Sequence, residues 1–296
     1  MPFVAAALMS HGSEALPEFG LAEFAPAFSH QSAVATQIAH CSPETLVVVT
    51  PHGVRSEGMM TVSYSETVEG ILDTPSGQRL RDIYSVNRSL AERFWQQPGP
   101  TQTAALGYGA TTGEHNRIPL DWGAHVPLRF VQMFLPTPFR VVVLTPSRAL
   151  SLERLYQYGS QLGSVMREWP GNVALIASGD LSHTHRESGP YGFDPAAAEL
   201  DQWFLDMLQT GNWSGLRAVS AQMVEQAKPD ALWQLAVVAG ALGEELFAPF
   251  MLAGYSCPTY FGMASAFAPA LKPDSGAHTN KEEGQPWASA PSPAQP

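Results

Sequence analysis

Apolar residues recur along this chain with two periods, one typical of buried strands and one typical of amphipathic helices. Three short runs are apolar almost throughout, which is typical of strands that are covered on both faces: Phe3–Met9, Thr45–Thr50 and Val173–Ala177. The pattern predicts further strands over Met59–Tyr64, Gln102–Leu106, Arg140–Leu144 and Pro258–Phe267. Helical spacing predicts helices over Gln31–His40, Ser76–Gln96, Trp122–Phe134, Ser151–Trp169, Pro195–Leu208 and Asp230–Leu242.

Strands and helices alternate through most of the chain, which predicts an α/β fold. We expect a single domain over residues 1–270, with a central mixed or mostly parallel sheet flanked by helices on both faces. From about residue 271 to residue 296 the chain is rich in Pro, Ser and Ala. Such a segment cannot bury a core, so it is predicted to be a disordered tail.

Three histidines follow the three most apolar runs. They stand in Ser10-His11-Gly12, in Pro51-His52-Gly53 and in the segment from Gly179 to His183. Parallel α/β sheets place functional groups beyond the carboxyl ends of their strands, so these histidines are expected at one edge. This pattern predicts a metal site with an acid–base group beside it.

Charge and composition exclude several other classes of function. The formal net charge is −11, which argues against nucleic-acid and anionic-membrane partners. The two cysteines are too few for a disulfide framework and are expected to be reduced, packed thiols. We expect a cytoplasmic protein, because the chain shows no basic leader and no apolar run of about 20 residues.

Four ordered motifs resemble those of the class III extradiol dioxygenase superfamily, which contains the catalytic subunit of protocatechuate 4,5-dioxygenase and the Memo-like proteins. The strongest runs from Ala177 to His183 and is followed by Gly189–Asp194. The others are Met9–His11, Pro51–Gly53 and Leu120–Leu128. The similarity covers nearly all of residues 3–267.

This resemblance implies a metal held by His11, His52 and a third residue at the start of the helix that ends in Gly240-Ala241-Leu242. The third ligand is a glutamate in dioxygenases and a cysteine in Memo-like relatives, and here the nearest acid is Asp230. Two histidines and a carboxylate suit Fe(II), with Mn(II) or Zn(II) as alternatives. Asp230 also stands where a carboxylate would simply cap a helix.

The resemblance further implies that His183 is a general acid–base residue. The alternative is a structural histidine oriented by Asp180. Many family members carry a histidine directly after the aspartate of the Leu120–Leu128 motif, where this chain has Trp122. His125, three residues later, either substitutes for it in catalysis or only packs. Trp122 could also narrow the pocket.

The function implied is that of an Fe(II)-dependent enzyme that opens a catechol or 2-aminophenol ring with O2. Two alternatives stay open, a Memo-like metal-binding redox or regulatory protein without ring cleavage, and a Zn-dependent hydrolase. The expected partners are a small aromatic substrate and O2. By analogy with relatives, the chain would form a homo-oligomer or take a second small subunit.

Overall fold

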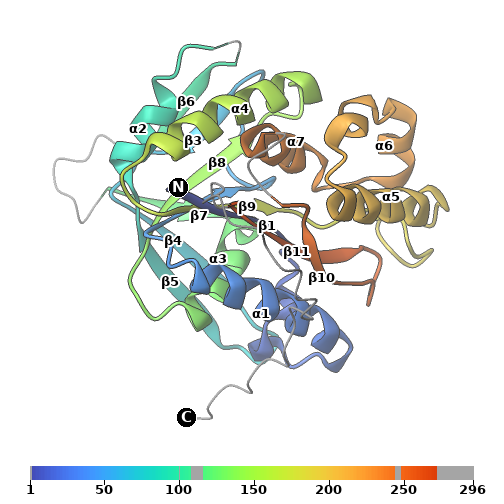
Figure 1. Ribbon diagram of the computed structural model, residues 1–296. Coiled ribbons are helices and arrows are strands. Elements are labelled where there is room, and N and C mark those ends of the chain that lie inside the picture. The colour runs from blue at the N-terminus through green and yellow to red at the C-terminus, as the bar shows by residue number, and fades with distance from the viewer. Residues whose placement is uncertain (1, 100, 108–115, 244–247, 272–296) are drawn as a thin grey trace, which may run out of the picture.

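Eight strands form one mixed sheet in the computed structural model of this protein, which describes residues 2–99, 101–107, 116–243 and 248–271 (Figure 1). The strand order is β10-β11-β1-β9-β2-β8-β3-β6, and a smaller sheet has the order β5-β4-β7. The strands of the large sheet are β1 (Phe3–Met9), β2 (Thr45–Val49), β3 (Met60–Ser63), β6 (Thr103–Leu106), β8 (Arg140–Pro146), β9 (Val173–Ser178), β10 (Met251–Ser256) and β11 (Met263–Pro269). Those of the small sheet are β4 (Thr67–Asp73), β5 (Arg79–Ser85) and β7 (Arg117–Leu120).

The four central strands are parallel. Strand β9 lies between β1 and β2, and β8 pairs with the other side of β2, so that the carboxyl ends of all four meet at one edge. Strand β11 is antiparallel to β1, and β3 is antiparallel to β8. The mixed α/β sheet predicted from the sequence is therefore confirmed.

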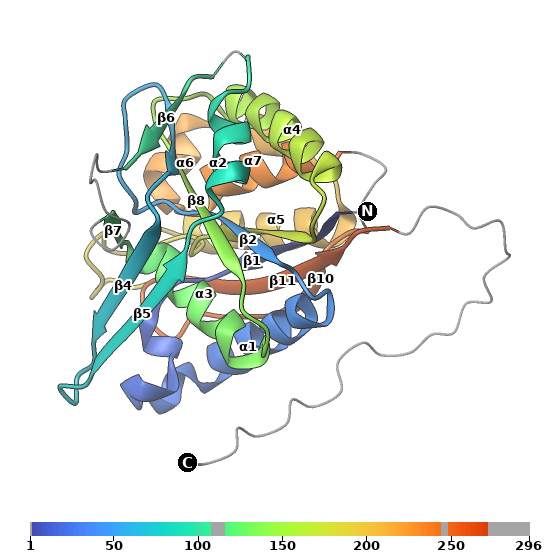
Figure 2. The same cartoon turned by 90° about the vertical axis from the view of Figure 1, so that its left-hand side faces the viewer.

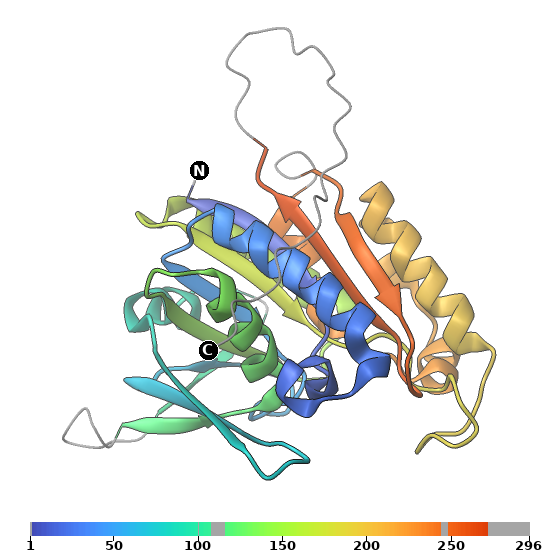
Figure 3. The same cartoon turned by 90° about the horizontal axis from the view of Figure 1, so that it is seen from below.

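Helices cover both faces of the large sheet (Figure 1). Alternate residues of β9 enter opposite cores, with Leu175 on one side and Ile176 on the other, which explains why these strands are continuously apolar. One core packs against α2 (Arg88–Trp95), α4 (Leu152–Glu168), α5 (Ala196–Thr210) and α7 (Leu232–Leu242). The other packs against α1 (Ala25–His40) and α3 (Trp122–Phe134), and α1 lies along this face beside β10 and β11 (Figure 3).

Short helical segments complete the fold. They are α6 (Ala221–Ala227) and 3-10 turns at Ser13–Ala15, Pro17–Phe19, Ala22–Phe24 and Trp213–Ala218. No helix in the described ranges has both the length and the apolar character needed to cross a membrane. The predicted tail, apart from Leu271, lies outside the residues that the structure describes.

The helix predicted over Ser76–Gln96 is wrong. The segment contains strand β5, which pairs with β4 in an antiparallel hairpin (Figure 2), and then the short helix α2. Leu80 and Tyr84 are buried and alternate with exposed residues, so the period is that of a strand. Gly77 has a φ of +84° in the hairpin turn, and Asn87 caps α2 by accepting from the Leu90 amide.

The predicted closing strand over Pro258–Phe267 is also corrected. Strand β11 begins only at Met263, and the expected start of the strand belongs to the loop that joins β11 to the antiparallel strand β10, which lies before the predicted range. Strand β10 was missed because its residues are only half-buried and because it contains Gly254, against which the ring of His30 packs, so no continuous apolar run marks it.

Candidate metal centre

Two histidines and an aspartate converge at the carboxyl edge of the central strands. His11 follows β1, His52 follows β2, and Asp230 lies two residues before the first residue of α7. Their ligand atoms all lie within 4.8 Å of one another. The structure therefore brings together the three residues that the sequence predicted as metal ligands.

The donor atoms of this group suit a divalent cation. The Nε2 atoms of His11 and His52 are 3.1 Å apart, and Asp230 Oδ2 lies 3.4 Å from the first and 3.7 Å from the second. Burial lowers the pKa of His11, and burial followed by the charges of His11 and Arg148 lowers the pKa of His52 to about 3. Both imidazoles are therefore neutral, as metal ligands must be.

Asp230 Oδ2 is buried and has no hydrogen-bond partner in the described residues. An orphaned carboxylate oxygen is costly in a protein interior unless a cation or a donor satisfies it. Two neutral nitrogens and this oxygen form the two-histidine, one-carboxylate set that leaves other coordination positions open. The residues present therefore fit a metal ion.

Ser178, the last residue of β9, sets the tautomer of His11. Its Oγ donates to the carbonyl of Gly123 and lies 3.1 Å from His11 Nδ1. Because a hydroxyl has a single proton, Nδ1–H of His11 must be the donor in the second bond. The lone pair of His11 is thereby placed on Nε2, which faces His52 and Asp230, as expected of a group that supports a metal ligand.

Trp122 lies over the ring of His52. The two rings are stacked with centroids 4.1 Å apart, and the indole is 48% exposed. A Cβ at Gly123 would lie 3.2 Å from His52 Cδ2 and 2.6 Å from Thr50 Oγ1, so this glycine allows the close approach of α3. Trp122 thus covers a candidate ligand from the solvent side.

Asp230 does not cap α7, because the N-cap position is Ala231 and no side chain caps this helix. Its Oδ1 instead accepts a hydrogen bond of 2.6 Å from Arg148 Nη2. Sequence reasoning missed Arg148, although it follows β8 and so ends at the same sheet edge as the histidines. The rule that functional groups follow the carboxyl ends of parallel strands, which led to the histidines, also applies to Arg148.

His183 lies next to Asp230, because the carbonyl of Leu181 accepts hydrogen bonds from both the backbone amide of Asp230 and the ring of His183. Its Nδ1 lies 3.0 Å from the carbonyl of Leu181 and 3.1 Å from that of Lys228, so it carries the proton and donates. Its ring stacks on Phe261 at 5.6 Å. Asp180 does not hydrogen-bond to this ring and instead accepts from the backbone amide of His11.

Comparison with known proteins shows the family of this chain. Residues 5–268 match the family model described as the catalytic LigB subunit of aromatic ring-opening dioxygenase. This chain belongs to the LigB family. The resemblance identified from its motifs is thereby confirmed.

This LigB-family chain is also similar to one curated protein and to one solved structure. Protein CA_C1420 of Clostridium acetobutylicum is 28% identical over 245 residues, which are 81% of this chain and 52% of that protein. The chain therefore spans about half the length of this curated relative. The crystal structure of uncharacterized protein JW3007 from Escherichia coli K12 has a TM-score of 0.55 at 18% identity, covering 89% of this chain and 99% of that one. At this identity the likeness shows the fold alone.

His125 is not part of the candidate metal group of this LigB-family chain, which consists of His11, His52 and Asp230. It is fully buried, its Nε2 is 2.7 Å from Asp82 Oδ2, and its ring packs against Gly70 in the small sheet. Trp122 and His125 therefore have different surroundings, although they are three residues apart on α3. A catalytic role for His125 stays a prediction.

Neither cysteine joins the metal group either, so the Memo-like ligand set is not present here.

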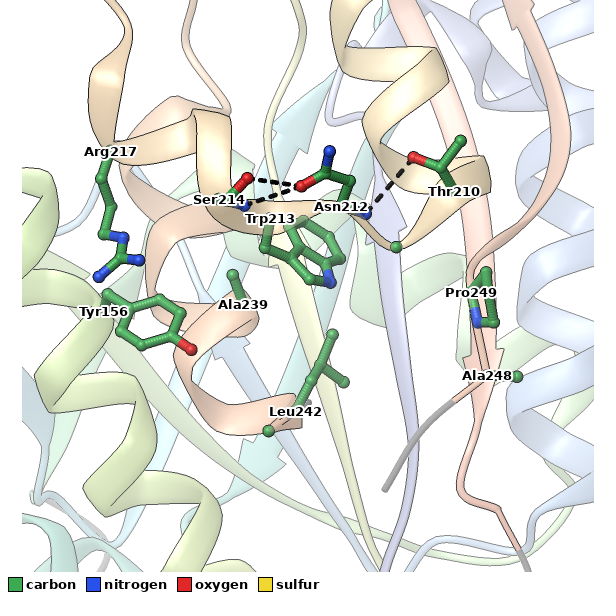
Figure 4. Close-up of a pocket in the computed structure, with 12 residues that line it drawn as sticks. Tyr156, Thr210, Asn212, Trp213, Ser214, Arg217, Ala239, Leu242, Ala248 and Pro249 are labelled. Carbon is green, nitrogen blue, oxygen red and sulfur yellow. Dashed lines mark hydrogen bonds between the residues drawn. The ribbon is translucent and has the colours of Figure 1, made fainter. Parts of the chain in front are cut away.

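A separate pocket of about 290 Å³ lies at the other end of α7, between Tyr156, Trp213 and Leu242 (Figure 4). None of the metal-group residues lines it.

Proposed function

We propose that this chain is a non-haem Fe(II)-dependent extradiol dioxygenase that opens a catechol or 2-aminophenol ring with O2. One observation carries the proposal: two histidines and a carboxylate, with ligand atoms within 4.8 Å of one another, stand beside His183, whose Nδ1 donates to two carbonyls and whose Nε2 has no hydrogen-bond partner among the described residues. Family membership supports the same reaction class. The aromatic substrate class and the preference for Fe(II) are both part of what we propose.

His11, His52 and Asp230 would hold the ion. When bound, Fe(II) supplies Lewis acidity toward two ring hydroxyls and a path for electrons to O2. The neutral imidazoles need not lose a proton first, which favours binding near neutral pH.

His183 is suited to hold and return a proton. The carbonyls of Leu181 and Lys228 fix its proton on Nδ1, so Nε2 is the basic atom. We infer that Nε2 takes a proton from a ring hydroxyl and later returns it, which typically contributes about 10²–10⁴-fold in rate. The ring of Phe261 orients the imidazole by stacking and covers one of its faces.

Exposed aromatic side chains border this group and favour a flat substrate. Trp122 stacks on His52, and the exposed Tyr191 contacts His183 edge-on at 6.2 Å. Aromatic rings of a substrate and a site gain from such offset or edge contacts. The ring of the substrate is expected between these two side chains.

The test is oxygen uptake by protein loaded anaerobically with Fe(II), scanned across catechols and 2-aminophenols. We expect uptake together with a ring-opened product, and its loss by about 10²-fold or more in His183→Ala. His40→Ala is the matched control, because His40 is exposed at the end of α1. Iron retention without uptake across the panel would overturn the dioxygenase proposal.

A further inference from the structure

Asp201 is a buried carboxylate on α5 that does not belong to the candidate metal group. The residue is only 2% exposed, and its two oxygens take part in three hydrogen bonds of 2.8 Å each. Oδ1 accepts from the backbone amide of Ser182, and Oδ2 accepts from His185 Nε2 and from the hydroxyl of Tyr255. No lysine or arginine of the described ranges pairs with this carboxylate, so these three donors alone satisfy it.

The two loop residues that Asp201 holds lie on either side of His183 in the sequence. Ser182 comes directly before His183, and His185 follows it by two positions. The third donor, Tyr255, lies on β10, and α5 runs alongside this strand (Figure 3). One carboxylate therefore ties the loop that carries His183 to a helix and a strand outside the metal group.

Gly262, directly before β11, shows how closely this carboxylate is enclosed. Its amide donates to the carbonyl of Ser182 at 3.0 Å. A Cβ at this glycine would lie 2.1 Å from Asp201 Oδ2 and 2.9 Å from the hydroxyl oxygen of Tyr255. The preceding residue, Phe261, carries the ring that stacks on His183. Asp201 thus lies between the loop of His183 and the segment that covers the imidazole.

Filling the core does not account for a carboxylate at this position. Its neighbours on the buried face of α5, such as Leu200 and Phe204, are apolar and belong to the core. Burying a carboxylate costs free energy that an apolar side chain would not. Only a carboxylate, however, offers enough acceptor sites for three donors at once. The position is therefore explained by what Asp201 holds.

We propose that Asp201 is a positioning residue that fixes His183 beside the metal group. By holding Ser182 and His185, it keeps the ring of His183 in reach of the two backbone carbonyls that retain its proton on Nδ1. This inference rests on the proposed function, in which Nε2 of His183 takes and returns a proton. Asp201 acts on that proton only through His183.

The experiment locates the proton of His183 by NMR. The full chain, labelled with ¹⁵N-histidine and loaded with diamagnetic Zn(II), is measured above the ordinary titration range of histidine. The ¹⁵N shifts of an imidazole report which nitrogen carries the proton, and the signals of His183 are those lost in His183→Gln. In the wild-type protein we expect the proton on Nδ1 alone.

His185→Leu and His185→Gln form the decisive pair, because a glutamine amide can donate to Asp201 as Nε2 does and a leucine cannot. We expect His185→Leu to show averaged shifts for the two tautomers of His183, and His185→Gln to keep the proton on Nδ1. Asp201→Asn, which leaves one acceptor oxygen for three donors, should behave like His185→Leu. Tyr255→Phe is the matched control, since it removes a bond of Asp201 that does not reach the loop. It should keep the wild-type shifts.

Oxygen uptake by the Fe(II)-loaded protein provides a second readout. His185→Leu should lose about tenfold in kcat with little change in KM, because the metal group that would bind the ring hydroxyls is left intact. Unchanged His183 shifts in both His185→Leu and Asp201→Asn would overturn the proposal. Changes of equal size in Tyr255→Phe would overturn it too, because a loosened core would then be sufficient. A wild-type protein without uptake would refute the dioxygenase proposal, while the NMR comparison would still decide the role of Asp201.

Discussion

At the scale of single residues, the site depends on which atom of each imidazole carries the proton. Ser178 fixes this for His11, and two backbone carbonyls fix it for His183. One histidine thus presents its lone pair to the metal group, while the other keeps a lone pair for a proton. Both rings carry the proton on Nδ1, so their different roles come from their positions: His11 Nε2 belongs to the cluster with His52 and Asp230, and His183 does not.

We expect Ser178→Ala to weaken metal binding by about 10–100-fold, because groups that orient a ligand have effects of this size. The measurement is a Zn(II) titration by calorimetry. Ser182→Ala is the matched control, since the buried hydroxyl of Ser182 has no hydrogen-bond partner in the described residues. A Kd unchanged in Ser178→Ala would show that the tautomer of His11 does not depend on this serine.

At the scale of elements, the position of Asp230 depends on how α7 packs against α4. The two helices approach through glycines, and a Cβ at Gly240 would lie 1.9 Å from the carbonyl of Tyr156. Gly159 and Gly163 on α4 meet carbonyls of α7 in the same way. Such contacts set the distance between the helices, and with it the place where α7 begins.

Gly240→Ala should therefore destabilise the protein. The helix propensity of alanine favours the change by about 1 kcal/mol, but the backbone carbonyl cannot move aside without separating the helices. Forced overpacking costs about 1–3 kcal/mol or more, so we expect a net loss in urea unfolding. Ser164→Ala, at an exposed position of α4, should have little effect. Equal midpoints for the two variants would contradict this account.

The elements also show what a sequence can reveal. The central strands were predictable because burial on both faces leaves a continuous apolar signature, as in β9. Strand β5 was not, because its polar residues face outward and only pairing with β4 decides its conformation. His11 and His52 followed from the strand-end rule and Asp230 from the family resemblance. The surroundings of His125 depend on the missed hairpin and could not be predicted.

At the scale of the whole molecule, a charged network attaches the small sheet to the body. Asp82 on β5 accepts from His125 at 2.7 Å and from Arg129 at 2.8 Å, and Arg129 also pairs with Glu18. Burial tends to raise the pKa of Asp82, but the hydrogen bonds from His125 and Arg129 outweigh it and hold this pKa below its ordinary value. The ionised form is thus the one that the fold favours.

The lowered pKa of Asp82 determines how the stability of the fold changes with pH. The contribution of Asp82 is fully present above the unfolded-state pKa of about 3.9 and is lost as the pH falls through the lower folded-state value. Asp82→Asn should be less stable than wild type by about 1–3 kcal/mol at pH 7, and the two should converge only when the pH falls below the lowered folded-state pKa of Asp82. Urea unfolding across pH measures this. Asp73→Asn, in an exposed pair at the hairpin tip, should follow the wild-type curve.

Removal of a bound metal should lower the stability of the whole fold, because His11, His52 and Asp230 come from three distant segments of the chain. A bound ion would join the ends of β1 and β2 to the start of α7, and it has no such site in the unfolded chain. At a free concentration of about 1,000 times Kd, binding stabilises the native state by about 4 kcal/mol. We therefore expect Zn(II) to raise Tm and EDTA to reverse the rise.

Asp230→Asn keeps the shape of the side chain while removing its charge, so its Tm should respond to neither reagent. Because Oδ2 would no longer be an orphaned anion, the metal-free variant should be no less stable than metal-free wild type. Calorimetric melting of both proteins, with and without Zn(II), separates the two effects. If Zn(II) raises the Tm of Asp230→Asn as much as that of wild type, the stabilising ion binds elsewhere, and the three-residue site is wrong.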